Sequence, residues 1–490
     1  MGVDERAPRV LFASPELAPH VKVGGLGEVS RDLPLALNRA GADVRTLVPA
    51  YPALKQAFAQ AQVVARIPPA GAMPAAQVLA ADEALYLLDC DALYARPGGP
   101  YQSADGVDWP DNYLRFGLLA RAAARLASEP GELGWRPQVV HANDWQTALT
   151  AAYLAFGKRS PVAVVQTIHN LAYQGVFPAG VLGDLALPQE AFTVDGLEFH
   201  GQISFLKGGI RYASTVTTVS PTYAREIQTP AFGAGLDGML RARSADLAGI
   251  LNGIDYSLWD PASDPHLAAR YNTDDLSGKT ANKAALQRTL GLPESAEMPL
   301  LGIVGRLVEQ KGIDLVLEAA EAIVRSPAQL VVLGEGPRRF VAALHALERR
   351  HPGEIAVRSG FDETLAHLIE AGADLFLMPS RFEPCGLNQL YSMRYGTPPL
   401  VHRTGGLADS VIDLNEGTPE RPATGFVFDS PTADALLATV RRALETYREP
   451  GAWRRLQRNG MVRDFRWDAS ARRYLEVYRA ALERCAVSAG

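Results

Sequence analysis

The sequence has little cysteine, no long apolar run and no excess of positive charge. Only Cys90, Cys385 and Cys485 occur among 490 residues, and three scattered thiols make neither a disulfide framework nor a zinc site. Nowhere do about 18 apolar residues follow one another, so we expect no membrane-spanning segment. The first apolar run, residues 10–14, has the length of a strand rather than of a signal-peptide core. These absences favour a reducing, cytoplasmic environment.

The charge balance argues against large anionic partners. Lys and Arg total 48 and Asp and Glu total 54, which gives a formal net charge of −6. A mildly acidic chain is a poor candidate for a dedicated binder of nucleic acid or of an anionic membrane. We therefore expect neither partner, and instead a neutral polymer or a small molecule held in a local basic pocket. Hydrophobic residues make up 47% and charged residues 21%, as in globular proteins.

Short apolar runs alternate with segments of helical period along the chain. In the first half these runs cover residues 9–14, 43–49, 84–88, 138–142, 162–168 and 215–219. In the second half they cover residues 300–305, 330–334, 354–358, 374–379, 399–402 and 425–428. The alternation predicts an α/β fold of two doubly wound, Rossmann-like parallel-sheet domains that face a cleft. We expect the domains at 1–245 and 246–465, and functional residues just after the strands.

Four polar or glycine-rich loops follow expected strands. The first, Lys22-Val-Gly-Gly-Leu-Gly-Glu28, opens a helix that we expect Pro34 to kink or end. Glycines at a helix N-terminus let backbone N–H groups approach a phosphate. The same loop nearly matches a dinucleotide fingerprint, but its last position is Ser30 and its approach from the strand is long, so a nicotinamide oxidoreductase is the weaker reading.

The second loop set is His141-Ala-Asn-Asp-Trp145 with Thr167-Ile-His-Asn170, two polar clusters at consecutive strand ends. The third is Gly305-Arg-Leu-Val-Glu-Gln-Lys-Gly312, where Arg306 provides a bidentate fork and Lys311 a point charge, a combination suited to a leaving diphosphate.

The fourth loop runs from Pro379 to Asn388 and precedes a helix expected at 386–395. Glu383 can accept hydrogen bonds from sugar hydroxyls, and the N–H groups that open the helix can hold a phosphate. Thr404-Gly405-Gly406 is a further glycine-containing loop, and it follows the next expected strand, at residues 399–402. Cys385 has no neighbouring histidine in sequence, so helix-entry packing is favoured over a nucleophile. Asp89-Cys-Asp91 resembles a metal-binding Asp-x-Asp, but we interpret it as a strand-end turn and expect no metal.

Together these loops resemble the bacterial glycogen synthase and plant starch synthase family, which uses ADP-glucose and has the GT-B fold. Further markers are Ile168-His-Asn-Leu-Ala-Tyr-Gln-Gly, Thr218-Val-Ser-Pro-Thr-Tyr, Leu251-Asn-Gly-Ile-Asp, and Arg381-Phe-Glu-Pro-Cys-Gly-Leu followed by Thr404-Gly-Gly-Leu-Ala-Asp409. The resemblance covers nearly the whole chain. It also implies that a C-terminal helix near 467–483, within a tail at 466–490, returns to the first domain, and that residues 109–113 lie near the acceptor.

The resemblance implies a retaining transfer of glucose from ADP-glucose to the non-reducing 4-OH of an α-1,4-glucan, without a cofactor. Arg306 and Lys311 would stabilise the departing diphosphate, while Asp144, His169 and Glu383 would hold the glucosyl group. Donor binding would further involve Lys22, Gly24, Gly25, Asn170, Phe361, Cys385, Gly386, Leu387, Asn388, Tyr391, Thr404 and Gly405.

Many bacterial members of the family have Thr at the positions of Val23 and Asn388, and an aromatic residue that is often Tyr at the position of Phe361. These departures bear on affinity and donor preference. The alternative is a catalytically silent glucan-binding or regulatory protein of the same fold. This alternative predicts that residues of the phosphate site have been lost. Arg306, Lys311 and Glu383 are all present.

Overall fold

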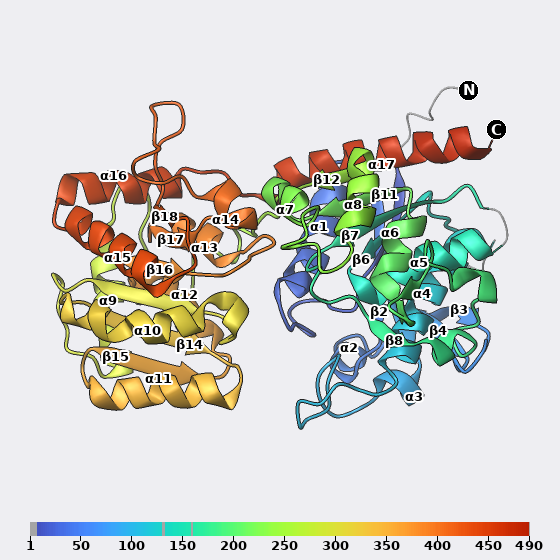
Figure 1. Ribbon diagram of the computed structural model, residues 1–490, viewed down its shortest axis with the longest axis horizontal. Helices are drawn as coiled ribbons and strands as arrows, with labels where there is room; N and C mark the ends of the chain where they lie inside the picture. The colour runs from blue at the N-terminus through green and yellow to red at the C-terminus, as the bar shows by residue number, and fades with distance from the viewer. Residues whose placement is uncertain (1–6, 130–132, 158–159, 490) are drawn as a thin grey trace. The chain divides into compact units, whose positions relative to one another are not determined.

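The computed structural model describes residues 7–129, 133–157 and 160–489, and the chain divides into two units (Figure 1). Unit 1 comprises residues 1–253 with 467–490, and unit 2 comprises residues 254–466. Unit 1 extends beyond the expected 1–245 because the short strand at 247–249 pairs with the strand at 215–218. Each expected strand is present within one residue of its expected ends.

Unit 1 is built on a nine-stranded sheet of order β12-β11-β7-β6-β1-β2-β5-β4-β3. The strands are β1 Arg9–Ala13, β2 Asp43–Pro49, β3 Gln62–Ile67, β4 Ala76–Ala80, β5 Leu85–Asp89, β6 Val139–Asn143, β7 Ala163–Ile168, β11 Thr215–Thr218 and β12 Leu247–Gly249. The sheet is parallel except at the β5-β4-β3 edge. A small sheet contains β8 Val176–Pro178, β9 Glu198–Phe199 and β10 Gln202–Ser204.

Helices cover both faces of this sheet, as near-continuous apolar strands require. Alternate residues of β1 face opposite cores: Leu11 and Ala13 pack with α4 and α5, whereas Val10 and Phe12 pack with α1 and α17. The helices of unit 1 are α1 Gly25–Arg39, α2 Pro52–Ala57, α3 Asp91–Tyr94, α4 Asn112–Ser128, α5 Trp145–Phe156, α6 Phe205–Tyr212, α7 Pro221–Glu226, α8 Asp237–Ala242 and α17 Trp467–Ala489, with 3₁₀ turns at Ala179–Leu182, Gln189–Ala191 and Ser244–Asp246.

The helix α1 continues through Pro34 to Arg39, so the expectation that proline might end it is wrong. Proline removes one intrahelical hydrogen bond. The buried face of Val29, Leu33 and Leu37, packed in one core with residues of β1 and α17, keeps the helix intact.

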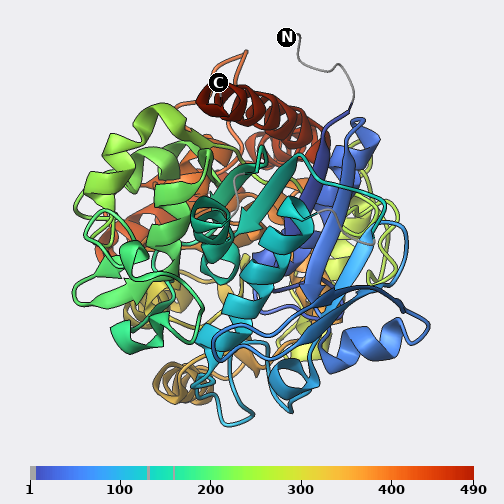
Figure 2. The same ribbon diagram turned by 90° about the vertical axis from the view of Figure 1, so that its right-hand side faces the viewer.

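The C-terminal helix α17, dark red in Figure 2, packs against α1 and β7 of unit 1. His141 of β6 hydrogen-bonds to this helix and to the neighbouring strand. Its Nδ1 lies 2.8 Å from the Tyr478 hydroxyl of α17, and its Nε2 lies 2.6 Å from Thr167 Oγ1 of β7. Burial lowers the pKa of His141 to about 3, so the ring is neutral. His141 is thus a satisfied core residue that joins β6 to the returning helix.

Unit 2 is a six-stranded parallel sheet of order β15-β14-β13-β16-β17-β18. Its strands are β13 Leu300–Val304, β14 Gln329–Gly334, β15 Ile355–Ser359, β16 Leu375–Met378, β17 Pro399–His402 and β18 Phe426–Phe428. Helices α10, α11, α15 and α16 share one core with the sheet, and α9, α12 and α13 share the other. The helices are α9 Ser277–Leu290, α10 Ile313–Arg325, α11 Arg338–Arg350, α12 Glu363–Gly372, α13 Asn388–Arg394, α14 Gly405–Ser410, α15 Ala433–Tyr447 and α16 Pro450–Met461, with a 3₁₀ turn at Glu309–Lys311.

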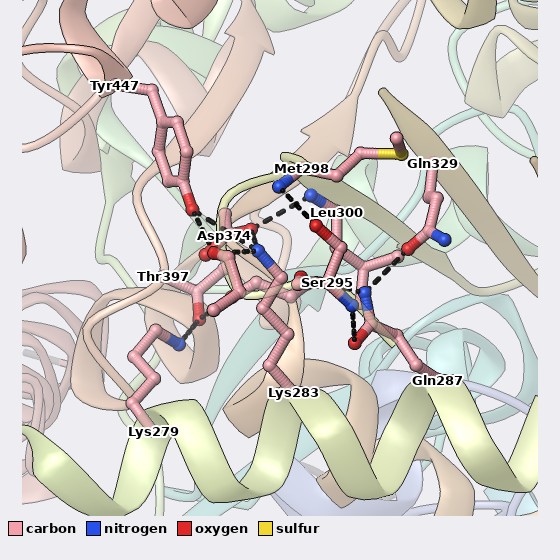
Figure 3. A network of polar contacts seen from close by, with 12 residues as sticks. Lys279, Lys283, Gln287, Ser295, Met298, Leu300, Gln329, Asp374, Thr397 and Tyr447 are labelled. Atoms are coloured by element: carbon pink, nitrogen blue, oxygen red, sulfur yellow. Dashed lines mark hydrogen bonds and ion pairs between the residues drawn. The ribbon is translucent and has the colours of Figure 1, made fainter. Parts of the chain in front are cut away.

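A buried polar network fastens α9 to the sheet of unit 2 (Figure 3). Lys283 Nζ lies 2.7 Å from Asp374 Oδ2, which also accepts the backbone N–H of Leu300 at 2.9 Å. Lys279 donates to Thr397 Oγ1 at 2.5 Å, and burial lowers the pKa of this lysine to about 7. The network fixes the start of β13, and Arg306 lies two residues beyond the other end of this strand.

Among the parallel strands, the strand order reverses at one place in each sheet. In unit 1 the reversal lies between β1 and β6, and in unit 2 it lies between β13 and β16; both pairs are hydrogen-bonded and parallel. Ligands of open α/β sheets bind outside the carboxyl ends of the strands at such a switch point. The glycine-rich loop, Asp144, Arg306 and the Glu383 loop all follow these four strands.

Candidate active site

In unit 2 the cationic loop after β13 meets the acidic loop after β16. Lys311 Nζ lies 2.5 Å from Glu383 Oε2, and Ser380 Oγ donates to the same oxygen at 3.0 Å. The Glu383 side chain is buried, whereas Lys311 is half-buried and Arg306 is exposed. The structure therefore brings Lys311 and Glu383 into one ion pair and leaves the Arg306 side chain at the surface beside the end of β13.

Glycine lets a third loop lie directly on the Glu383 loop. Gly405 has a left-handed backbone (φ +43°), and a Cβ there would lie 1.9 Å from the carbonyl oxygen of Glu383. The N–H of Gly406 donates to that oxygen at 3.1 Å, and a Cβ on Gly406 would lie 2.1 Å from the carbonyl oxygen of Cys385. Thr404 is buried beside them. Residues 383–385 and 404–406 thus form one packed layer that excludes any side chain at 405 and 406.

The helix after the Glu383 loop begins later than expected. α13 starts at Asn388 rather than at Gly386, because Gly386 has φ +73°, a left-handed conformation outside any right-handed helix. The N–H groups of Gly386 and Leu387 therefore belong to a turn before the helix. Gln389 Nε2 donates to the carbonyl oxygens of Cys385 and Gly386 at 3.0 Å each, and so fixes this turn.

Asn388, one of the departures from the family pattern, has a defined role. Its Nδ2 donates at 2.9 Å to the carbonyl oxygen of Val304, the last residue of β13. The side chain therefore ties the start of α13 to the strand that leads to Arg306. Cys385 is buried, which agrees with helix-entry packing rather than nucleophilic chemistry.

The two aromatic candidates of unit 2 differ in exposure. Phe361 follows β15 and is 75% exposed, so its ring is accessible to a stacking partner. Tyr391 is only 5% exposed, and its ring stacks on the indole of Trp259 with centroids 3.8 Å apart. Phe361 is therefore an accessible ring at a strand end, whereas Tyr391 is part of the core below the loops.

In unit 1 the glycine-rich loop surrounds a carboxylate that the sequence patterns did not indicate. Glu16 Oε2 accepts the backbone N–H groups of Val23 at 2.8 Å and of Gly24 at 3.4 Å, and its Oε1 accepts the Tyr101 hydroxyl at 2.5 Å. Burial raises the pKa of Glu16. Gly24 is the N-cap of α1 and Gly25 its first residue. Two loop amides expected to meet a phosphate thus already bind an internal carboxyl group.

Lys22 also has a carboxylate partner within the loop. Its Nζ lies 2.8 Å from Glu28 Oε1; the Glu28 side chain is buried, whereas Lys22 is exposed. The only signal for Glu16 in the sequence is a carboxylate just after the first strand, Ser14-Pro-Glu16, which is weak without the fold.

Asp144 is held in a strained, buried position after β6. Its φ is +58°, which is uncommon for a non-glycine residue, and such strain clusters at functional sites. Burial raises its pKa to about 8, so the carboxyl group is mainly protonated at pH 7. The backbone N–H of His169 donates to Asp144 Oδ1 at 3.4 Å. The two strand-end clusters are therefore joined, as expected for neighbouring strands.

His169 is a neutral, oriented imidazole. Its Nε2 lies 3.0 Å from Asn143 Oδ1, and burial lowers its pKa to about 3. Asn170 follows, and its Oδ1 accepts the N–H of Ala172 at 3.1 Å. A protonated carboxyl, a neutral imidazole and an amide suit hydrogen bonds to uncharged hydroxyl groups.

The Asp-x-Asp segment has a cation of its own. Lys55 Nζ lies 2.9 Å from Asp89 Oδ1 and 2.8 Å from Asp91 Oδ1. Asp89 ends β5 and Asp91 begins α3, so the segment is a strand-end turn in which one lysine pairs with both carboxylates. Within the described part of the chain, no group of three or more metal-ligating side chains is found.

Comparison with known proteins places this geometry in a family. The model of the starch synthase catalytic domain matches residues 9–242, and that of the glycosyl transferases group 1 matches residues 291–460. A glycogen synthase of Dechloromonas aromatica is 54% identical over 96% of this chain and 98% of its own length. The chain belongs to the glycogen and starch synthase family. A glycogen synthase of Nitrosospira multiformis is 50% identical over 97% of each chain.

Solved structures confirm the fold class. The catalytic domain of starch synthase IV from Arabidopsis thaliana, bound to ADP and acarbose, is 32% identical, with a TM-score of 0.86 over 98% of this chain and 100% of that chain. A sucrose-phosphate synthase from Thermosynechococcus elongatus is 20% identical with a TM-score of 0.60, over 96% of this chain and 98% of that one, and shares the fold. The chain is thus a GT-B glycosyltransferase with two Rossmann-like domains, and a hexosyltransferase that uses a nucleotide-sugar donor and a glucan acceptor. Over the described residues, no helix has the length and apolarity to cross a membrane.

Proposed function

We propose that the chain is a glycogen synthase that transfers glucose from ADP-glucose to the non-reducing 4-OH of an α-1,4-glucan with retention of configuration. The observation that carries this proposal is the Lys311–Glu383 pair at the switch point of unit 2, beside Arg306. A cation at a strand end suits a departing diphosphate, and a buried carboxylate suits sugar hydroxyls. The ADP bound by the related plant starch synthase supports ADP as the leaving group.

In the proposed donor site, Arg306 and Lys311 neutralise the charge that develops on the diphosphate. Preorganised charges at a leaving group are typically the largest single contribution to catalysis. The turn of Cys385, Gly386 and Leu387, with Asn388, Thr404 and Gly405, holds the phosphate and sugar by backbone groups. Phe361 stacks on the adenine through its exposed ring. Tyr391 contributes indirectly, because its stacking on Trp259 holds α13 in the core of unit 2.

Unit 1 contributes the groups that hold sugar hydroxyls. Burial keeps Asp144 and His169 mainly uncharged at pH 7, and Asn170 has no ionisable group. These three side chains can therefore bind sugar hydroxyls without attracting or repelling the charged diphosphate. Lys22 provides the positive charge of the glycine-rich loop, and Gly24 and Gly25 allow close approach of the donor. Glu16 keeps this loop in shape.

The reaction breaks the bond between the anomeric carbon and the diphosphate oxygen and forms a bond to the acceptor O4. A double displacement would need an ionised carboxylate on the far face of the ring. Asp144 is mainly protonated at pH 7, which disfavours it as that nucleophile. We therefore favour return on the same face, in which the leaving phosphate oxygen accepts the proton of the acceptor hydroxyl, while His169 positions the sugar.

One assay tests the function. ADP release from ADP-glucose and UDP release from UDP-glucose are compared with glycogen as acceptor, each with and without EDTA. We expect ADP release that depends on glycogen, exceeds UDP release and persists in EDTA. Glycogen binding without ADP release would refute the enzyme assignment. Loss of activity in EDTA would instead return Asp89 and Asp91 to consideration as metal ligands.

A further inference from the structure

The chain enters unit 2 at Ile254 and leaves it at Arg466, and the two crossing segments are joined to each other. Ile254 and Arg466 form a parallel bridge, and the N–H of Ile254 donates to the carbonyl oxygen of Phe465 at 2.8 Å. The Tyr256 hydroxyl accepts the N–H of Phe465 at 3.0 Å and donates to the carbonyl oxygen of Arg463 at 3.0 Å. Movement of one segment therefore requires movement of the other.

Both crossing segments are fastened to α13, the short helix that follows the Glu383 loop. The Arg394 guanidinium lies over the Tyr256 ring, 4.5 Å from its centroid, and its Nη2 lies 2.5 Å from Asp260 Oδ2. Its Nη1 donates to the carbonyl oxygen of Met461, at 3.3 Å, on the outgoing side. One arginine of α13 thus holds the incoming and the outgoing chain together.

A stack of three rings makes the second connection. Trp259, on the incoming segment, lies between His367 of α12 and Tyr391 of α13, with centroids 3.8 Å apart on each side and interplanar angles of 9° and 13°. The stack is buried. Tyr391 lies one helical turn after Asn388, whose side chain is bonded to the end of β13.

Hydrogen bonds fix the orientation of this stack. Asp264, also on the incoming segment, places its Oδ2 2.7 Å from His367 Nδ1 and accepts the Tyr395 hydroxyl on the same oxygen at 2.5 Å. The imidazole cannot rotate without losing this partner, and Tyr395 directly follows α13. Apolar packing of the three rings would not by itself require hydrogen bonds. The bonds from Asp264 to His367 and Tyr395 specify one position of α13 relative to the incoming segment.

We infer that α13 couples the donor loop to the crossing segments, and that Trp259 is the positioning residue of this coupling. The inference rests on the proposed function, because it takes the Glu383–Asn388 loop as the place where the nucleotide diphosphate binds. A diphosphate that pulls on the turn at 385–388 displaces α13, and the stack and Arg394 transmit that displacement to residues 254–264 and 461–466.

Hydrogen exchange on the full-length chain tests the coupling directly. Exchange of the amides of Ile254 and Phe465 is measured with and without saturating ADP, after calorimetry has established that ADP binds. We expect ADP to change exchange at both amides by at least about fivefold, as for a segment whose local opening is linked to a ligand. ADP binding with no change at either amide would overturn the inference, whereas absence of ADP binding would refute the donor-site assignment instead.

Two matched tryptophan variants separate coupling from packing. Trp259→Leu removes the stack, and Trp453→Leu removes the other buried tryptophan of unit 2, which packs near Phe426 and Tyr447 in the opposite core. We expect Trp259→Leu to raise the Kd of ADP about tenfold and to abolish the exchange response, while Trp453→Leu keeps both. Trp259→Phe, which retains a ring and tests the inference even if Trp259→Leu does not fold, should restore the response. Equal behaviour of folded Trp259→Leu and Trp453→Leu, or loss of the response in folded Trp259→Phe, would overturn the inference.

Discussion

The glycine at 405 offers the sharpest test of the site, because the structure says how far its neighbours must move. An added Cβ would lie 1.9 Å from the carbonyl oxygen of Glu383, and real Cβ atoms essentially never approach closer than 3.0 Å. Gly405→Ala must therefore displace the two backbones by at least 1.1 Å, the difference between these distances. Since a misplacement of about 1 Å can cost about 100-fold in rate, we expect kcat/KM to fall about 100-fold.

The matched control is Gly291→Ala. Gly291 also has a left-handed backbone, φ +75°, but nothing lies within 4 Å of an added Cβ. Both variants incur the left-handed penalty of about 1–2 kcal/mol for alanine, and Gly405→Ala adds an overpacking cost of about 1–3 kcal/mol. Urea unfolding measures these stabilities, and ADP release at saturating glycogen measures activity.

The activities of Gly405→Ala and Gly291→Ala show whether the close packing at residue 405 shapes the donor site. We expect Gly291→Ala to keep kcat/KM within about twofold of the parent, since its cost falls on stability alone. Gly406→Ala supplies a second test, because its added Cβ would lie 2.1 Å from the Cys385 carbonyl oxygen without a left-handed backbone. If folded Gly405→Ala were as active as Gly291→Ala, the packed layer of 383–385 and 404–406 would not shape the donor site.

Three further outcomes are expected. Lys311→Ala should lower kcat/KM for ADP release about 100- to 1000-fold, as loss of one preorganised charge does, and near-normal transfer would exclude it as a leaving-group residue. Glu16→Gln leaves one acceptor oxygen where Tyr101 and the amides of Val23 and Gly24 use two, so exchange of these amides should quicken and kcat/KM should fall about tenfold; unchanged exchange would contradict this. The pKa of Asp144 is raised from 3.8 to about 8, so its contribution to stability is full below pH 4 and is lost as pH rises through 8. Asp144→Asn should therefore gain stability relative to the parent between pH 5 and pH 8 in urea unfolding, and a constant difference would refute the assignment.

Much of the fold could be predicted because buried parallel strands have a strong signature. The runs at 43–49 and 399–402 match β2 and β17 at both ends. The strands β3 and β4 were missed because they form an antiparallel edge whose outer residues are exposed, so their apolar runs are interrupted. Pro34 was misjudged because proline opposes a helix locally, while burial against α17 decides the outcome.

The arrangement of the candidate site was predictable wherever topology alone brings residues together. Lys311 and Glu383 are 72 residues apart, yet both follow strands that are neighbours in a parallel sheet. Glu16 and Trp259 were missed because their roles depend on the path of irregular segments, which have no periodicity. Nothing near Tyr101 in the sequence indicates a bond to a carboxylate 85 residues away.

The charges of the site sharpen the inference drawn from the net charge of −6. Each lysine expected to meet a phosphate already has a carboxylate partner, Glu28 for Lys22 and Glu383 for Lys311. These partners hold the ammonium groups in place within each unit. In the proposed donor site a diphosphate would share each lysine with its carboxylate, so we expect the exposed Arg306 guanidinium to contribute most to initial capture of the donor, and the lysines most to stabilising the charge that develops as the bond breaks.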